Sequence, residues 1–300
     1  MNINLKEFIQ SNKISENSDF ICIELKASEC PDYIIDKIIY AQQTSFQGPK
    51  QKINLTIRET NDSSYTHILV FTKTDFTLVG GTKFYYHKKS TYLNTCKKSY
   101  LEYSYPGFYK YNHDRDFIEL GRTYVINCYR KNYALSTLLF TSSMNSMIRY
   151  STLFIGLMTY DQTKNSDFIN KLFLSALTNN HFITSEFKVP DPRFSCIDNT
   201  LNNDEYLQYN IQDIKTLRNL QEQILSIAKE KITMPTLLKQ YYQVFGTKTL
   251  GLSIGKSFNN LIEVFAYTDL ATISYSRLKY FLTEKNLELI KSTTIYKPLS

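Results

Sequence analysis

The stretch that decides the fold is FIELGRTYVINCYRKNYALSTLLFTSSMNSMIRYSTLFIGLMTY, residues 117–160. Residues 116–127 are rich in branched and aromatic side chains, which favour a β-strand, and 152–160 form a second apolar run that predicts a buried strand. The segment between them, 130–150, predicts a helix with four apolar residues on one face: Phe140, Met144, Met147 and Ile148. A strand–helix–strand unit of this length has room for the right-handed crossover that parallel strands require.

The flanking segments extend this unit into an α/β (α+β) chain. Before it we expect a helix at 32–46, short antiparallel strands at 53–57, 67–73 and 76–87, and a long irregular segment at 88–116. After it we expect helices at 168–177, 217–227 and 233–245, strands at 249–255 and 261–270, and a last helix at 275–291. The nonperiodic segment 190–205 is the best candidate for a boundary, so we expect a core domain at 1–190 and a C-terminal extension at 191–300 that packs on it.

Composition narrows the class of protein. A hydrophobic fraction of 42% in 300 residues supplies a real core, and the net charge of +7 favours acidic partners or anionic surfaces without demanding nucleic acid. The five cysteines form no CxxC pair, which favours a reduced cytoplasmic protein without structural zinc. The N-terminus has no apolar run of signal-peptide length, and no 18 consecutive apolar residues occur, so neither secretion nor a membrane span is expected.

Several motifs resemble known sites but fail on spacing. The run GLSIGKS at 251–257 has three residues between its glycines where a P-loop needs four, so we expect a hairpin between two strands. The four histidines have no metal-ligand spacing, and we expect no metal. Basic pairs such as Lys88–Lys89 alternate with tyrosines, as in a groove for single-stranded nucleic acid, but acidic residues are scattered among them. Nucleic acid is therefore not an expected partner, although a binding module of that class stays an alternative.

The run IELGRTYVINCYRK carries the strongest chemical signal. Glu119 stands three residues before Arg122, so strict alternation along a strand would place them on opposite faces. One extra residue at Gly121, as in a β-bulge, would bring both side chains to one face and splay the strand from its neighbour. The unpaired backbone groups could then bind an extended pantetheine arm, and the N–H groups at the next helix start, with Arg130 and Lys131, could face its phosphate. This arrangement predicts an acyl-thioester site.

These residues also carry a resemblance to a known family. The Glu-Leu-Gly-Arg run, the Tyr-Arg pair before the helix, the strand LFIGLMTY and the later MPTLLKQY resemble the hemolysin-like N-acyltransferases of the GNAT superfamily. That family includes the ornithine-lipid and glycine-lipid N-acyltransferases and is distantly similar to the acyl-homoserine-lactone synthases. Within it, the chain is most similar to the longer version found in bacteroidete-type bacteria. The resemblance implies a GNAT-like fold whose mixed central sheet is splayed at the Glu119 strand.

The resemblance implies transfer of a 3-hydroxy fatty acyl group from acyl carrier protein to the amine of an amino acid or similar small acceptor, without a tightly bound cofactor. Glu119 would be the base or amine-orienting carboxylate, and Arg122 would fix its geometry or the donor arm. The donor would lie along six residues of the strand and helix start: Thr123, Tyr124, Val125, Arg130, Lys131 and Asn132. The opposite wall, for substrate, would be Leu157, Met158, Thr159 and Tyr160. Peripheral contact with the inner face of the membrane is also compatible with a lipid product.

The sequence departs from the family at the pyrophosphate loop Q/R-x-x-G-x-G/A. With Arg130 in first place, Tyr133 and Leu135 stand where glycine and a small residue are expected. Close approach to the pyrophosphate of acyl-CoA is disfavoured by this change, while the single phosphate of a carrier-protein arm tolerates it better. Transfer from acyl-CoA, an autoinducer-like synthesis and a noncatalytic acyl- or lipid-binding protein stay open. Glu119 and Arg122 could also be an ordinary ion pair at a strand edge.

Overall fold

The computed structural model describes residues 4–46, 64–89, 99–179, 181–196, 200 and 208–292. The chain forms two compact units, and each is described by itself. Unit 1 comprises Met1–Lys88, Asp116–Thr152 and Ser274–Ser300, and unit 2 comprises Lys89–Arg115 and Leu153–Ile273. The boundary expected at residue 190 lies inside unit 2; a separate C-terminal extension stays a prediction.

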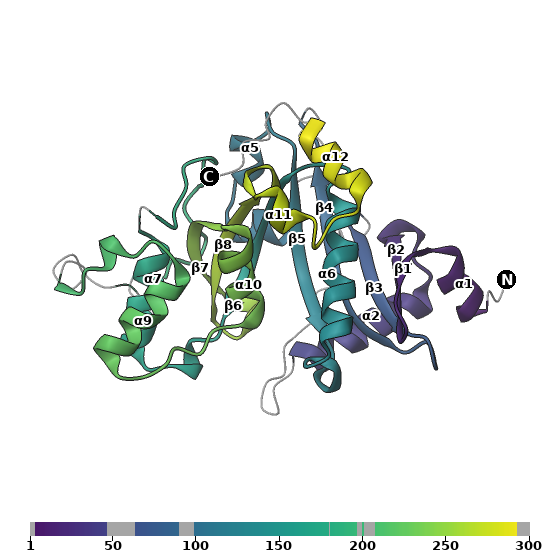
Figure 1. Cartoon of the computed structure of the whole chain (residues 1–300), viewed down its shortest axis with the longest axis horizontal. Helices are drawn as coiled ribbons and strands as arrows, with labels where there is room; N and C mark the ends of the chain where they lie inside the picture. Colours follow the sequence, from purple (N-terminus) through teal and green to yellow (C-terminus); the bar gives the residue numbers. More distant parts are fainter. Residues whose placement is uncertain are drawn as a thin grey trace. The chain divides into compact units, whose positions relative to one another are not determined.

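Unit 1 is built on a sheet of five antiparallel strands paired in sequence order, β1 to β5 (Figure 1). The strands are β1 (Lys13–Glu16), β2 (Phe20–Lys26), β3 (Thr66–Thr72), β4 (Leu78–His87) and β5 (Phe117–Val125). The helices are α1 (Leu5–Ser11), α2 (Asp32–Phe46), α6 (Tyr133–Met147), α11 (Tyr275–Leu278) and α12 (Glu284–Ser292). The predicted strand at 53–57 lies outside the described residues.

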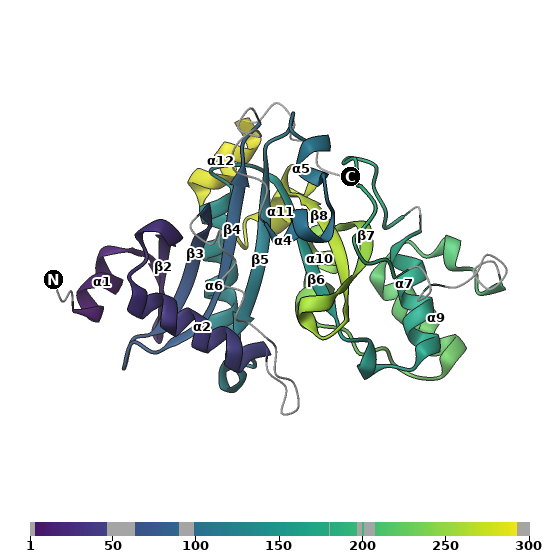
Figure 2. The same ribbon diagram turned by 180° about the vertical axis from the view of Figure 1, so that it is seen from behind.

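The two long helices of unit 1 cover opposite faces of this sheet. Helix α6 lies over β1 to β4 (Figure 1), and α2 lies over β4 and β5 on the other face (Figure 2). On the α2 face, Ile34 and Ile38 pack into a core with Leu69, Phe71 and Tyr124. The rhythm of branched residues in 32–46 therefore predicted both the helix and its buried side, and both are confirmed.

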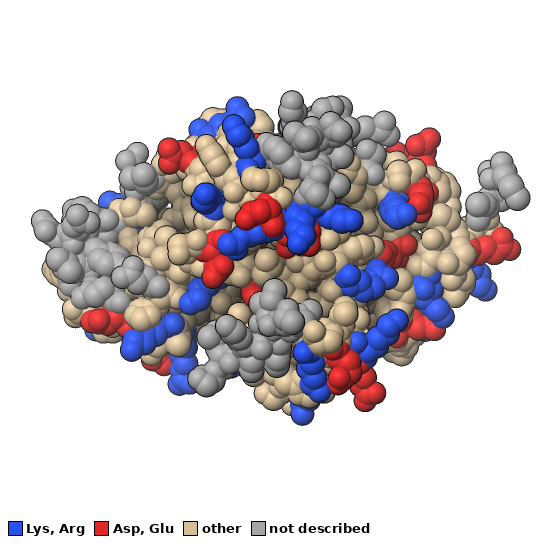
Figure 3. Space-filling model, turned by 90° about the horizontal axis from the view of Figure 1, so that it is seen from above, with Lys and Arg blue, Asp and Glu red and all other residues tan. Residues whose placement is uncertain are grey.

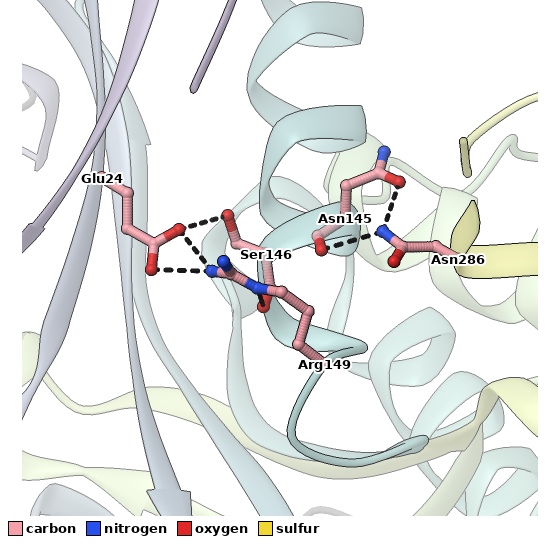
Figure 4. Close-up of polar contacts among 5 residues, drawn as sticks. All are labelled: Glu24, Asn145, Ser146, Arg149 and Asn286. Carbon is pink, nitrogen blue, oxygen red and sulfur yellow. Dashed lines mark hydrogen bonds and ion pairs between the residues drawn. The ribbon is translucent and has the colours of Figure 1, made fainter. Parts of the chain in front are cut away.

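The α6 face contains a polar network (Figure 4). Arg149 donates to both carboxylate oxygens of Glu24, at 2.8 and 2.6 Å, and Ser146 donates to Glu24 Oε2 at 2.7 Å. Glu24 lies on β2. The sequence predicted neither this strand nor the two elements before it, α1 and β1. These contacts join β2 to the C-terminal end of α6.

The sequence predicted one helix at 275–291. This prediction is wrong, because the segment forms two helices, α11 and α12, with a break between them. Asn145 of α6 binds the polar groups at the break: its Nδ2 donates to the Phe281 carbonyl at 2.8 Å, and its Oδ1 accepts from Thr283 N at 2.9 Å. Backbone groups at a helix break lose their hydrogen-bond partners within the helix. The side chain of Asn145 replaces these partners, which lowers the free-energy cost of the break.

Unit 2 is built on an antiparallel sheet in the order β6–β8–β7. The strands are β6 (Leu153–Tyr160), β7 (Lys248–Gly255) and β8 (Leu261–Asp269), and the helices are α4 (Tyr100–Ser104), α5 (Phe108–Tyr111), α7 (Asp167–Leu177), α9 (Leu217–Ala228) and α10 (Thr236–Phe245). The helices α7, α9 and α10 form an apolar core with one face of the sheet. The run GLSIGKS ends β7 and turns into β8, so the predicted hairpin is confirmed.

Within the described part of the chain, no helix combines the length and the apolar character needed to cross a bilayer. On the face seen in Figure 3, basic and acidic side chains of the described residues are interspersed rather than sorted by sign. That distribution differs from the single-sign stripe that marks a nucleic-acid footprint.

Candidate active site

The predicted β-bulge is present in β5. Gly81 pairs with Tyr124 and Lys83 pairs with Gly121, so the one residue between them on β4, Thr82, faces both Arg122 and Thr123. The extra residue thus lies at Arg122 and Thr123, one position later than expected. Arg122 takes a left-handed conformation with φ of 45°, which is uncommon for a residue other than glycine.

The bulge places Glu119 and Arg122 on the same face of the sheet. Glu119 pairs with Tyr85, which shares the α2 face with Gly81 and its partner Tyr124. On that face Arg122 donates from Nη1 to Gln42 Oε1 of α2, at 3.5 Å. Strands β4 and β5 remain paired on both sides of the bulge.

Glu119 lies in a buried polar cluster that the sequence did not predict. Its side chain is 4% exposed and accepts a hydrogen bond of 3.0 Å from the Tyr65 hydroxyl. The Lys83 ammonium lies 4.2 Å from the centre of the Tyr65 ring, and both residues are 3% exposed. Tyr65 and Glu119 are 54 positions apart, so no pattern within one segment predicted their contact. The sequence shows only that Tyr65 stands beside one strongly apolar run and that Lys83 stands within another.

The turn between β5 and α6 is tied to the end of α2. Arg130 donates to the Ser45 carbonyl and, at 3.4 Å, to the Val125 carbonyl. Asn127 donates to the Thr44 carbonyl at 3.1 Å. Carbonyls in the last turn of a helix lack partners within the helix, so these contacts also stabilise α2.

The remaining predicted donor-binding residues of unit 1 lie nearby along the chain. Asn132 is the N-cap of α6 and accepts from Leu135 N at 3.0 Å, while Lys131 is exposed. Thr123 is exposed, and its hydroxyl lies 2.8 Å from that of Thr82; Tyr124 is buried against α2. The roles of these residues and of Arg130 in binding a donor phosphate stay predictions.

The predicted substrate wall, Leu157–Tyr160, belongs to β6 of unit 2. Its four side chains alternate between two faces of that strand. Tyr160 is fully buried in the α7 core, where its hydroxyl donates to Asn170 at 2.6 Å and accepts from Asn165 at 2.8 Å. Burial raises the pKa of Tyr160. Met158 packs on the same core, and Leu157 and Thr159 occupy the opposite face of the strand. The predicted slot would have this wall, which belongs to unit 2, on one side and Glu119, which belongs to unit 1, on the other. It stays a prediction.

Unit 2 also contains a buried carboxylate that the sequence did not single out. Glu263 on β8 is 1% exposed and accepts hydrogen bonds from the Tyr100 hydroxyl at 2.6 Å and from Ser253 at 3.0 Å. Burial raises the pKa of Glu263, and its hydroxyl donors oppose the rise. Among the residues that the structure describes, no cluster of three or more histidine, cysteine and acidic side chains could hold a metal ion.

Comparison with known proteins adds independent information. Residues 37–140 match the family model of an acetyltransferase (GNAT) domain, a range that includes Glu119, Arg122 and the start of α6. A search of curated proteins found no significant match.

Three solved structures show limited similarity at 10% identity. The loading GNATL domain of CurA from Lyngbya majuscula covers 84% of this chain and 98% of its own, with a TM-score of 0.41. The CoA-dependent acyl-homoserine lactone synthase BjaI, with SAM and isopentyl-CoA, covers 93% and 89%, with a TM-score of 0.36. An aminoglycoside 6'-N-acetyltransferase complexed with coenzyme A covers 83% and 97%, with a TM-score of 0.31.

The predicted fold class is therefore confirmed, since the mixed α/β architecture agrees with the GNAT match. The family resemblance is confirmed at the level of the GNAT domain, and the lipid-forming subfamily stays a prediction. Residues 37–140 carry the match to an acetyltransferase (GNAT) domain, and this match supports a general N-acyltransferase.

Proposed function

We propose that this N-acyltransferase moves a 3-hydroxy fatty acyl group from an acyl carrier protein thioester to the amine of an amino acid or a similar small acceptor. Glu119 is the base or amine-orienting carboxylate. Arg122 positions the donor arm or the carboxylate. Thr123 to Val125 and the residues directly before α6, Arg130 to Asn132, hold the donor arm and its phosphate.

The observation that carries this proposal is the bulge in β5. It sets a buried carboxylate and a guanidinium on one face of a strand, within the range that matches the GNAT model. A bulge re-aims side chains and interrupts regular pairing, and such features are frequent beside active sites. The left-handed backbone of Arg122 is a strained feature of the kind that collects at functional sites.

The chemistry requires one proton acceptor and no covalent enzyme intermediate. The acceptor ammonium gives a proton to Glu119, and its nitrogen then attacks the thioester carbonyl carbon. The C–N bond forms as the C–S bond breaks, and the departing thiolate takes up the second proton that the attacking nitrogen loses, so the products are an amide and a free thiol. A positioned general base contributes roughly 10² to 10⁴ in rate to such a reaction.

The net charge of +7 supports an acidic protein as donor, because complementary charge raises encounter rates and selects partners. Tyr133 and Leu135, which stand in place of the small residues of a pyrophosphate loop, favour a carrier-protein phosphate over acyl-CoA. A lipid-like product is also consistent with peripheral contact at the inner face of the membrane.

The test supplies the full chain with 3-hydroxyacyl carrier protein or with 3-hydroxyacyl-CoA, each with a panel of amino acids, and identifies N-acyl products by mass spectrometry. We expect product with the carrier protein, and a loss of roughly 10² to 10⁴ in turnover for Glu119→Gln. Glu29→Gln is the matched control, because Glu29 is an exposed carboxylate of the same unit that pairs with Lys26.

Product from acyl-CoA alone would favour the CoA-dependent alternative. No product with either donor, or turnover in Glu119→Gln equal to that of the native chain, would favour a noncatalytic acyl- or lipid-binding protein. Retention of a 3-hydroxy fatty acid by the purified chain would then support that second class.

A further inference from the structure

Tyr65 and Lys83 form a buried polar arrangement around Glu119 that packing alone does not explain. Lysine and glutamate are almost never fully buried unless they are paired, because removing their charges from water is costly. Both are buried here on one face of the sheet, with the Tyr65 ring beneath the ammonium and the Tyr65 hydroxyl on the carboxylate. Well-packed apolar side chains at the same positions would often be equally stable or more stable.

The tyrosine is held in place from several directions. It directly precedes β3, and its carbonyl accepts a hydrogen bond of 2.8 Å from Ala27 N. Its ring lies 5.8 Å from that of Tyr85, which pairs with Glu119 across β4 and β5. The phenol therefore reaches Glu119 Oε1 from a fixed position.

The lysine is held against the backbone of β5. Lys83 pairs with Gly121, and a Cβ at Gly121 would lie 3.4 Å from Lys83 Cε and 3.6 Å from Cγ. The stem of Lys83 thus runs across Gly121, directly before the bulge, and its ammonium ends over the Tyr65 ring at 4.2 Å. A cation over the face of a phenol withdraws electron density from the ring and makes its O–H a stronger hydrogen-bond donor.

We infer that Tyr65 and Lys83 are positioning residues for Glu119: the lysine polarises the tyrosine, and the tyrosine orients the carboxylate and stabilises its charged form. This inference rests on the proposed function, in which Glu119 must be ionised before the acceptor amine gives up its proton. A hydrogen bond to the charged form of an acid favours that form. The two residues hold Glu119 ready to accept a proton without contacting the substrate themselves.

Other ionisable groups also face this side of the sheet. On the strands they are His67, Tyr85, His87, Tyr124 and, across the bulge, Arg122; Cys30, which precedes α2, packs against the same core. The buried side chains of helix α2 do not titrate in the physiological range: Ile34, Ile38, Ala41, Gln42 and Ser45. Tyr65 hydrogen-bonds to Glu119, and Lys83 lies over the Tyr65 ring. Substitutions of these two residues therefore test most directly how the surroundings of Glu119 affect its titration.

The experiment labels the glutamate side-chain carboxyl carbons of the full chain with ¹³C and follows the Glu119 signal, assigned by its loss in Glu119→Gln, through a pH titration. We expect the titration midpoint of Glu119 to rise by about one pH unit in Tyr65→Phe and in Lys83→Met. Lys83→Arg keeps the cation and should stay within about 0.3 pH unit of the native chain. Tyr150→Phe is the matched control, since its ring lies against Phe84 and Tyr86 in the same unit, on the α6 face.

Unchanged midpoints in both Tyr65→Phe and Lys83→Met would overturn the inference. Tyr65→Phe removes a single oxygen and decides the matter alone if Lys83→Met does not fold. With an active donor and acceptor, the rising limb of the pH profile of kcat/KM should move in the same direction as the NMR midpoint. A native chain that forms no product while the NMR shifts persist contradicts the proposed function; product formation with unmoved midpoints contradicts the positioning roles.

Discussion

Asn286 of α12 donates from Nδ2 to both oxygens of Asn145, to the side-chain Oδ1 at 2.8 Å and to the backbone carbonyl at 3.0 Å (Figure 4). With the Phe281 and Thr283 contacts, one asparagine of α6 thereby fixes the break between α11 and α12. Helix α12 buries Leu287 and Ile290, so the polar contacts set the position in which these apolar residues pack.

Asn145→Ala should lower the free energy of unfolding by about 2 to 3 kcal/mol, because it removes the side-chain partner of the Phe281 carbonyl and of Thr283 N, and one of the two hydrogen bonds of the Asn286 amide. Urea denaturation measures this loss, and hydrogen exchange should show faster exchange at Thr283 N. Thr141→Ala is the control: its hydroxyl bonds only within α6, to the Thr137 and Leu138 carbonyls. Equal stability of the two variants would contradict the role assigned to Asn145.

The backbone of Arg122 predicts an unusual preference for glycine in a strand. A left-handed conformation costs an L-residue roughly 1 to 2 kcal/mol that glycine does not pay, so Arg122→Gly should be about 1 kcal/mol more stable than Arg122→Ala. Both variants lose the contact with Gln42, which cancels in the comparison. At Thr123, whose φ is not positive, the order should reverse, with alanine the more stable. Chemical denaturation of the four variants checks the two signs.

Two glycines on adjacent strands should respond differently to a methyl group. A Cβ at Gly81 would lie 2.9 Å from the Ile68 carbonyl oxygen and 2.9 Å from the Tyr124 hydroxyl, so Gly81→Ala should cost about 1 to 3 kcal/mol. At Gly121 the nearest atom is the flexible Lys83 Cε at 3.4 Å, and Gly121→Ala should stay within about 0.5 kcal/mol of the native chain. Thermal unfolding of the pair tests the contrast; a Gly81→Ala variant as stable as Gly121→Ala would contradict it.

Glu263 gives unit 2 a pH-dependent contribution to stability. Burial raises the pKa of Glu263 above its ordinary 4.5, so the folded state holds the proton to higher pH than the unfolded state does. The contribution is complete below pH 4.5 and is lost as the pH rises through the raised pKa. Glu263→Gln removes this titration, so the stability of the variant relative to the native chain should increase with pH. Denaturation at several pH values measures the trend, and a stability difference that does not change with pH would contradict this assignment.

The sequence predicted those parts of the fold whose cause is local. The rhythm of apolar residues in 117–160 and 32–46 was enough to predict β5, α6, β6 and α2, since each buries one continuous face. Strand β2 was missed although six of its seven residues are at least half-buried, because its polar member Glu24 finds its partners Ser146 and Arg149 more than a hundred positions later. A pairing at that distance leaves no local pattern.

The candidate site could be predicted in part, because some of its features follow from local spacing and others depend on contacts between distant segments. The spacing of Glu119 and Arg122 around Gly121 predicted a bulge, and the one-residue difference in its position follows from Arg122 taking the left-handed conformation itself. Tyr65 reaches Glu119, and Lys83 reaches the Tyr65 ring, only because three strands align in one register, which depends on the whole sheet. Periodicity along one segment does not contain that information.

The return of residues 274–292 to unit 1 has a consequence for biosynthesis. Every strand of unit 2 leaves the ribosome before the residues that Asn145 binds, so the three-stranded sheet of unit 2 can form while α6 still lacks α11 and α12. During translation, Phe140 of α6 therefore lacks its ring contact with Phe281 until the segment 275–292 emerges, and chaperone binding is best sought in that interval.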